Sequence, residues 1–141
     1  METIIYSSFS LVSHGMFLKA IYDTYDTLKQ IAEHPYIKSN LEELDMDTQL
    51  QLIEHILGDI EDQYKSESLK ISISKIHEII EKIKETLIEL DAEIKLHDQR
   101  YFNMWRLYYF DPYLNKLRRY KTILGERFDL MLRIKTMEKL K

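Results

Sequence analysis

The longest regular pattern of apolar side chains in the sequence begins at Leu69 and ends near Tyr108. Its members follow one another at alternating steps of four and three residues: Leu69, Ile73, Ile76, Ile80, Ile83, Leu87, Leu90, Ile94, His97, Tyr101, Met104 and Tyr108. Such steps place side chains on one face of an α-helix, and over several heptads they are typical of a coiled-coil seam. The pattern therefore predicts one helix over residues 69–110, about 60 Å long at ~1.5 Å per residue.

The start of this segment is also compatible with a β-strand. Apolar and polar residues alternate in Lys70-Ile71-Ser72-Ile73-Ser74, as they do in a half-buried strand. No other segment offers itself as a partner strand. We therefore favour a helix here and keep the strand as the alternative.

Helical spacing recurs on both sides of the long segment. Residues 9–33, 47–64 and 113–139 each carry apolar side chains at steps of three and four. Pro35 and Pro112 bound these segments, because proline lacks a backbone donor and disfavours a helical residue before it. The predicted helices are residues 9–33, 47–64, 69–110 and 113–139.

Residues 34–46 form the connection between the first two predicted helices. Within it, Ser39-Asn40-Leu41-Glu42 matches a capping box, in which a serine is followed three residues later by a glutamate. This match predicts a short helical turn that starts at Ser39. Asp47 is a second capping candidate, at the start of helix 47–64.

These elements predict an all-α fold, an antiparallel helical bundle of about four helices around the long coiled-coil-like helix, in a single domain over residues 1–141. Short connections make consecutive helices antiparallel neighbours. Helix 47–64 should then cover the first half of the long helix, and helix 113–139 should cover its second half after a reversal at Pro112. Gly125 lies in the middle of the last helix and indicates a kink or a close approach of another helix.

The composition supports helices and excludes several other classes of protein. Three glycines and two prolines in 141 residues are too few for the tight turns of an all-β fold. The absence of cysteine excludes disulfides and thiolate metal sites, and it fits an intracellular, cytoplasmic protein. No apolar run approaches the ~20 residues of a membrane span, and the first 18 residues lack the basic start of a signal peptide.

The net charge of −4 hides an asymmetry along the chain. Residues 1–98 carry 9 Lys and Arg against 20 Asp and Glu, whereas residues 99–141 carry 11 against 4. Such a division indicates internal complementarity, head-to-tail association of copies, or a basic surface for an acidic partner.

Few residue spacings indicate catalysis or a metal. His-Glu-x-x-His, Gly-rich phosphate loops and Gly-x-Ser-x-Gly are absent. Glu93 and His97 lie one helical turn apart and share the spacing of two metal ligands, but a partly buried histidine in the seam is the simpler interpretation. We therefore expect a protein that is not an enzyme, with no catalytic residue, metal or cofactor.

One acidic pattern resembles that of all-α nucleotide pyrophosphatases, in which Glu-x-x-Glu and Glu-x-x-Asp hold Mg²⁺. Its counterparts here are Glu78-Ile79-Ile80-Glu81 and Glu126-Arg127-Phe128-Asp129. If the chain reverses at Pro112, Glu126 faces about residue 97, roughly 25 Å from Glu81 and Glu78 at ~1.5 Å per residue. This register argues against a shared metal site.

Three binding functions remain, of which the weakest is a regulatory adaptor whose groove accepts a partner helix. The leading expectation is a structural or assembly protein that acts through helix–helix contacts as a homo-oligomer or in a larger assembly, with partner-binding residues along the seam: Ile73, Ile76, Ile80, Ile83, Leu87, Leu90 and Ile94. The alternative is nucleic-acid binding by the basic last 43 residues, through Arg118, Arg119, Lys121, Arg127, Arg133 and Lys135. The abundance of Ile, Lys and Tyr is typical of AT-rich genomes, including those of large DNA viruses, so a virion component is among the structural roles that we consider.

Overall fold

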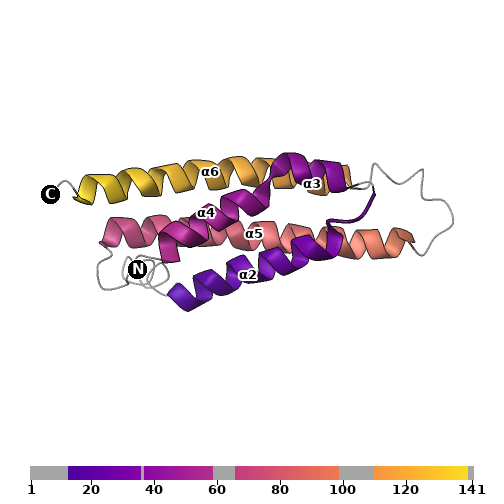
Figure 1. The fold of residues 1–141 in the computed structure, drawn as a ribbon, viewed down its shortest axis with the longest axis horizontal. Helices are drawn as coiled ribbons and strands as arrows, with labels where there is room; N and C mark the ends of the chain where they lie inside the picture. Colours follow the sequence, from indigo (N-terminus) through magenta and orange to yellow (C-terminus); the bar gives the residue numbers. More distant parts are fainter. Residues whose placement is uncertain (1–12, 36, 59–65, 99–109, 140–141) are drawn as a thin grey trace, which may run out of the picture.

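The computed structural model describes residues 13–35, 37–58, 66–98 and 110–139, and every regular element among them is an α-helix (Figure 1). In chain order the helices are α2 (His14–Ile31), α3 (Lys38–Leu44), α4 (Met46–Gly58), α5 (Glu67–Asp98) and α6 (Asp111–Lys139). The predicted all-α class is confirmed. The alternative of a strand at 70–74 is wrong, because these residues lie inside α5. None of the helices in the described part is both long enough and apolar enough to cross a membrane.

The ends of the helices differ from the predicted ranges. α2 starts after Ser13, whose Oγ accepts a hydrogen bond of 3.1 Å from the Met16 backbone N–H. Ser13 is thus the N-cap, and it satisfies one of the amides that the first helical turn leaves unpaired. The predicted helical residues 9–12, 59–64 and 99–109 lie outside the described residues.

α3 begins one residue before the predicted capping box. Its N-cap residue is Ile37, which makes no side-chain cap hydrogen bond, so Ser39 lies within the first turn and does not cap the helix. The capping-box prediction is therefore wrong in position, although a short helix does form here. The backbone instead starts the helix through a Leu41 N–H that donates to the Ile37 carbonyl at 3.0 Å.

Asp45 separates α3 from α4. It adopts a left-handed conformation with φ of 47°, and its N–H donates to the Leu41 carbonyl at 3.1 Å. Aspartate is one of the few residues besides glycine that tolerates this conformation at a helix end. Its carboxylate accepts a hydrogen bond of 2.8 Å from Thr48 Oγ1. Asp45 rather than Asp47 is thus the residue whose side chain accepts a hydrogen bond at the start of α4.

The longer helices run alongside one another (Figure 1). α2 and α5 point in one direction, whereas α3, α4 and α6 point in the other. α5 packs along α2 on one side and α6 on the other, and α4 lies against α2 and α6. The expectation that helix 47–64 covers the first half of the long helix is not confirmed, because the backbone of α4 makes its main contacts with α2 and α6.

The register between α5 and α6 also differs from the expectation. Arg127 Nη1 donates to the Lys75 carbonyl at 2.7 Å, and Ser66 Oγ donates to a Glu138 carboxylate oxygen. These contacts set α6 antiparallel to α5, and the predicted corner at Pro112 is wrong because Asp111 and Pro112 already belong to α6. Pro112 lies in the first turn of α6, where its missing N–H is not needed by the helix.

The core is built on the apolar seam of α5. The seven seam residues proposed above are at most 6% exposed, and Ser72, Ile79 and Thr86 are buried beside them at steps of seven. This additional line widens the buried stripe, because α5 packs against two helices rather than one. The buried hydroxyl of Thr86 is satisfied because it donates a hydrogen bond of 2.8 Å to the Lys82 carbonyl. The alternating serines near residue 72 thus belong to a helix enclosed on two sides.

Gly125 marks a close approach of α4 to α6. A Cβ atom at this position would lie 3.2 Å from Nε2 of Gln49. That is shorter than an ordinary van der Waals contact, so the space is occupied by the Gln49 side chain. Of the two explanations for Gly125 offered by the sequence, the close approach agrees with the structure.

Candidate functional site

A groove with a volume of about 650 Å³ lies between α2, α3 and α4. It lies along the second half of α2 and the first half of α4, and α3 closes one end. Its lining residues are Tyr22, Tyr25, Asp26, Leu28, Lys29, Ala32, Glu33, Lys38, Leu41, Glu42, Asp45, Met46, Asp47, Gln51 and Glu54. We call this the acidic groove. No sequence motif indicates this groove, because its three walls come from separate helices.

The groove has an apolar floor and a strongly negative rim. Leu28 and Met46 are buried, and Leu41 packs against the core from the α3 side. Around them stand six carboxylates against two lysines. The left-handed turn at Asp45 contributes to this arrangement, because it leaves Met46 buried and the Asp45 side chain exposed. An apolar floor with an acidic rim suits a ligand that is both apolar and cationic.

Two tyrosines share the carboxylate of Glu54 at one wall of the groove. Tyr22 Oη donates to Glu54 Oε1 at 2.9 Å, and Tyr25 Oη donates to Oε2 at 3.5 Å. Partial burial, followed by the charges of Glu54 and Asp47, raises the pKa of Tyr25 to about 12. The hydrogen bond to Glu54 and its charge also raise the pKa of Tyr22. Both phenols therefore remain protonated donors near neutral pH, and they add ring surface to an anionic wall.

The predicted seam residues are not accessible at the surface. Ile76, Ile80, Ile83, Leu87 and Leu90 have no solvent exposure, and Ile73 and Ile94 are nearly buried. α2 and α6 occupy the faces of α5 that carry them. A partner would reach the seam only by displacing one of these helices.

The six basic residues proposed for α6 do not share one face. Arg118 and Arg127 lie about 180° apart around the helix, at about 100° per residue. Arg118 donates to Oδ1 of Asn115 at 2.8 Å and to Oδ1 of Asn40 at 2.7 Å. Arg127 reaches across to α5, and Arg119 lies 5.4 Å from the centre of the Tyr120 ring. Arg119 and Arg133 are exposed, while Lys121 and Lys135 are half-buried.

α6 nevertheless presents an outward stripe that is mainly apolar, with Arg133 and Glu126 exposed on the same side. Leu130 and Met137 are 54% and 64% exposed, and at helical spacing they lie on the same side as Ile134 and the exposed Arg133. Beside them is a shallow hollow of about 230 Å³ between α5 and α6, lined by Ser68, Ile71, Ser72, Lys75, Arg127, Leu130 and Ile134. We call Leu130, Arg133, Ile134 and Met137, with this hollow, the outer face of α6.

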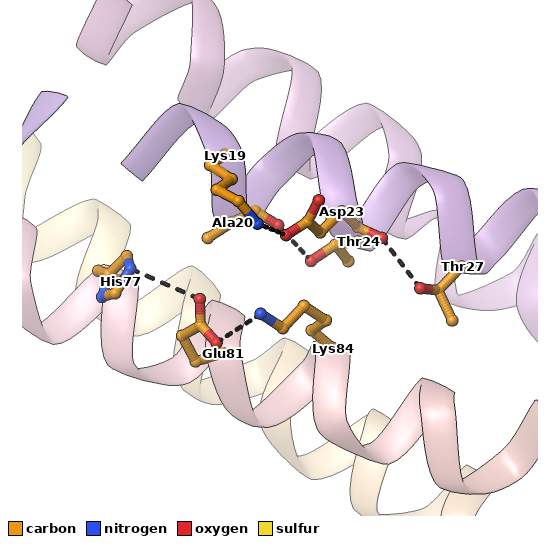
Figure 2. A network of polar contacts seen from close by, with 8 residues as sticks. All are labelled: Lys19, Ala20, Asp23, Thr24, Thr27, His77, Glu81 and Lys84. Carbon is orange, nitrogen blue, oxygen red and sulfur yellow. Dashed lines mark hydrogen bonds and ion pairs between the residues drawn. The ribbon is translucent and has the colours of Figure 1, made fainter. Parts of the chain in front are cut away.

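Polar side chains on the facing sides of α2 and α5 make their contacts within their own helix (Figure 2). Lys19 Nζ lies 2.7 Å from Asp23 Oδ2 on α2, and Lys84 Nζ lies 2.8 Å from Glu81 Oε2 on α5. Burial, assisted by the charge of Lys84 and opposed by Glu81, lowers the pKa of His77. His77 is therefore mainly neutral near pH 7, and its 3.6 Å contact with Glu81 is not a full ion pair there.

No group of three or more acidic or histidine side chains within the described residues could hold a metal ion. Glu93 lies in α5, but the side chain of His97 is outside what the structure describes. The register argument against the pyrophosphatase-like pattern is wrong, because Arg127 lies beside Lys75 and the two acidic segments are therefore close in space. The four carboxylates still form no metal-binding group.

The ion pairs between described side chains are local. Each joins residues at most five positions apart, such as Lys38 with Glu33 at 3.8 Å and Lys95 with Asp91 at 2.9 Å. No ion pair between described side chains therefore joins α6 to α2, α3 or α4, although Arg127 lies close enough to Glu78 on α5 for its charge to act on that carboxylate.

Comparison with known proteins adds no assignment. A scan against models of protein families, a search of curated proteins and a search of solved structures each found no match.

Proposed function

We propose that this chain is a non-enzymatic structural or assembly protein that acts through helix–helix contacts. Its helices form an antiparallel bundle, and the acidic groove receives a basic, amphipathic helical segment of a protein partner. Such a protein serves in a homo-oligomer or in a larger intracellular complex, a virion among them.

The observation that carries this proposal is the acidic groove itself. Its volume of about 650 Å³ is far larger than the ~30 Å³ that one water molecule occupies in the liquid. Lys29 and Lys38 leave four of its six carboxylates without a matching positive charge in the lining. A basic helix brings compensating charges to the rim while its apolar side chains cover Leu41 and Met46.

The alternative, nucleic-acid binding by α6, has weaker support. Its basic side chains point in several directions, and both Arg118 and Arg127 make hydrogen bonds within the molecule. Phosphate contacts along a duplex require several cations on one side. The exposed apolar residues Leu130 and Met137 favour a protein surface over a polyphosphate chain.

A peptide-binding experiment tests the proposal. The probe is a labelled synthetic helix of about 18 residues made of Leu and Lys, with leucines at steps of three and four, and the matched control probe has Glu in place of Lys. Fluorescence anisotropy should show that the chain binds the Lys probe, that salt weakens binding, and that the Glu probe does not bind.

The groove variant Asp26→Lys/Glu42→Lys removes two rim carboxylates that are exposed. Because two negative charges of the rim become positive, the variant should bind the Lys probe about tenfold more weakly. The control variant Glu85→Lys/Glu89→Lys makes the same change of charge on exposed positions of α5 and should bind as the wild type does. Equal weakening by both variants, or equal binding of both probes, would contradict a specific role of the groove.

A further inference from the structure

Two complementary surfaces lie on opposite sides of the molecule. The acidic groove is formed only by α2, α3 and α4, whereas the outer face of α6 is formed only by α6 and the start of α5. α4 and α5 each contact both α2 and α6. The side of the molecule formed by α2 and α4 therefore lies opposite the side formed by α5 and α6. The surfaces also lie toward opposite ends, because the groove is next to α3 and the hollow is next to the start of α5 (Figure 1).

The charges of the two surfaces are opposite. The groove carries six carboxylates and two lysines, whereas the charged lining of the hollow consists of Lys75 and Arg127, with Arg133 exposed beside it. Over the whole of α6 there are eight basic and four acidic residues. Since the ion pairs between described residues are local, this complementarity is not consumed between α6 and the groove of the same molecule.

The apolar parts also correspond. Leu130 and Met137 are more than half exposed on α6, and side chains of this size are favoured in an interface rather than in water. In the groove, the partly buried Leu41 and the aromatic Tyr25 border an open volume. A helix with leucine and methionine at its centre and arginine at its margin matches that lining.

We infer that the occupant of the acidic groove is the outer face of α6 from a second copy of this chain, so that copies associate head to tail. This inference rests on the proposed function and identifies its partner. Because the two surfaces differ and lie on opposite sides, the contact is heterologous: each bound copy leaves one free groove and one free outer face. Such contacts extend into chains of copies unless their rotation closes a ring.

The test uses the full chain and two variants that each disable one surface. The groove variant is Asp26→Lys/Glu42→Lys, and the face variant is Leu130→Glu/Arg133→Glu, in which both replaced residues are exposed. Circular dichroism confirms that both variants fold. Sedimentation velocity is then measured from micromolar to millimolar chain at low and high salt.

The wild type should form species larger than dimers as concentration rises, and high salt should reverse this. Each variant alone should remain monomeric, because one of the two required surfaces is lost. An equimolar mixture should stop at a one-to-one dimer, since the groove variant retains an outer face and the face variant retains a groove. The Glu85→Lys/Glu89→Lys control should assemble as the wild type does.

Three results would overturn head-to-tail association: a wild-type chain that is monomeric at every concentration, a wild type that saturates as a dimer, or a mixture that fails to dimerise. A monomeric chain that binds the Lys–Leu probe in its groove would leave the proposed function standing with a different partner. A monomeric chain that also ignores the probe would contradict both.

Discussion

The contact between Gln49 and Gly125 makes a stability prediction in which two effects of similar size compete. Replacing glycine by alanine in the interior of a helix stabilises the helix by about 1 kcal/mol. Gly125 lies in the middle of α6, so Gly125→Ala should gain this amount if its surroundings were open. They are not open, because the new Cβ would lie 3.2 Å from Gln49 Nε2.

The cost of that contact follows from the state of Gln49. Its Oε1 atom is buried and has no hydrogen-bond partner, so the amide lies in a confined site between α4 and α6. Alanine at 125 would force Nε2 to move by a few tenths of an ångström. Overpacking in a confined site costs about 1–3 kcal/mol, and the end of a flexible side chain places this case near the lower limit. We expect the two effects to cancel, and Gly125→Ala to change the free energy of unfolding by less than about 0.5 kcal/mol.

A double-mutant cycle isolates the competition. In the background of Gln49→Ala the obstacle is gone, so Gly125→Ala should recover the full gain of about 1 kcal/mol. For a chain of this size that gain corresponds to a rise in Tm of about 4 °C. Gly58→Ala is the control, since nothing lies within 4 Å of its added Cβ. Gly58 is the last residue of α4, and its replacement should change the free energy of unfolding by the same amount in either background.

The measurement is urea denaturation followed by circular dichroism at 222 nm, with all variants at one low concentration. The quantity that decides is the difference between the effects of Gly125→Ala in the two backgrounds. If Gly125→Ala stabilises the wild type as much as it stabilises Gln49→Ala, the close approach of α4 to α6 does not restrict this position and the reasoning fails.

Two further predictions concern the core and the groove. Leu87 has no solvent exposure, whereas Ile88 is 51% exposed. In urea denaturation, Leu87→Ala should lower the free energy of unfolding by about 2–5 kcal/mol, and Ile88→Ala should lower it by less than about 1 kcal/mol. Equal losses would show that α5 does not bury the face that carries Leu87. In the folded chain Tyr25 should titrate near pH 12, measured as the difference in absorbance at 295 nm between the wild type and Tyr25→Phe, and Glu54→Gln should lower that pKa. Because the folded pKa lies above the usual value of 10.0, Tyr25 contributes stability below pH 10 that is lost as pH rises toward 12. A midpoint near 10 would mean that Tyr25 is neither partly buried nor beside Glu54 in solution.

The helical class was predictable because its signals are local. The steps of four and three in residues 69–98 describe one face of one helix, and that face is buried in α5 as its periodicity requires. The placement of Ser13 as N-cap was also within reach, since it precedes the helix and carries a suitable hydroxyl. The capping box at Ser39 matched equally well and was wrong, because the backbone started α3 one residue earlier.

Packing between helices was less predictable. The rule that consecutive helices are neighbours did not identify α2 and α6 as the main neighbours of α4, and the assumption of a reversal at Pro112 displaced the register of α6 along α5. Proline has two meanings near a helix: it can end one, or it can stand in the first turn of the next. Only the contacts between Arg127 and Lys75 and between Ser66 and Glu138 distinguish them.

The acidic groove illustrates why a binding surface was harder to predict than a core. Asp26 on α2, Glu42 on α3 and Asp47 on α4 each look like an ordinary exposed residue of its own helix. They become one surface only when three helices are placed together, and the sequence signal that hinted at it was the division of charge along the chain.

The division of charge along the chain has a different meaning once the helices are placed in space. The sequence left three explanations for an acidic first part and a basic last part, and internal complementarity requires ion pairs between the corresponding helices. In the described residues the ion pairs remain within short stretches of chain, and the apolar seam that could have bound a partner is buried by α2 and α6. What remains at the surface is an acidic groove on one side and, on the other, a mainly apolar stripe that carries Arg133. Association of copies uses both surfaces, whereas a separate acidic partner on α6 would leave the groove without a ligand.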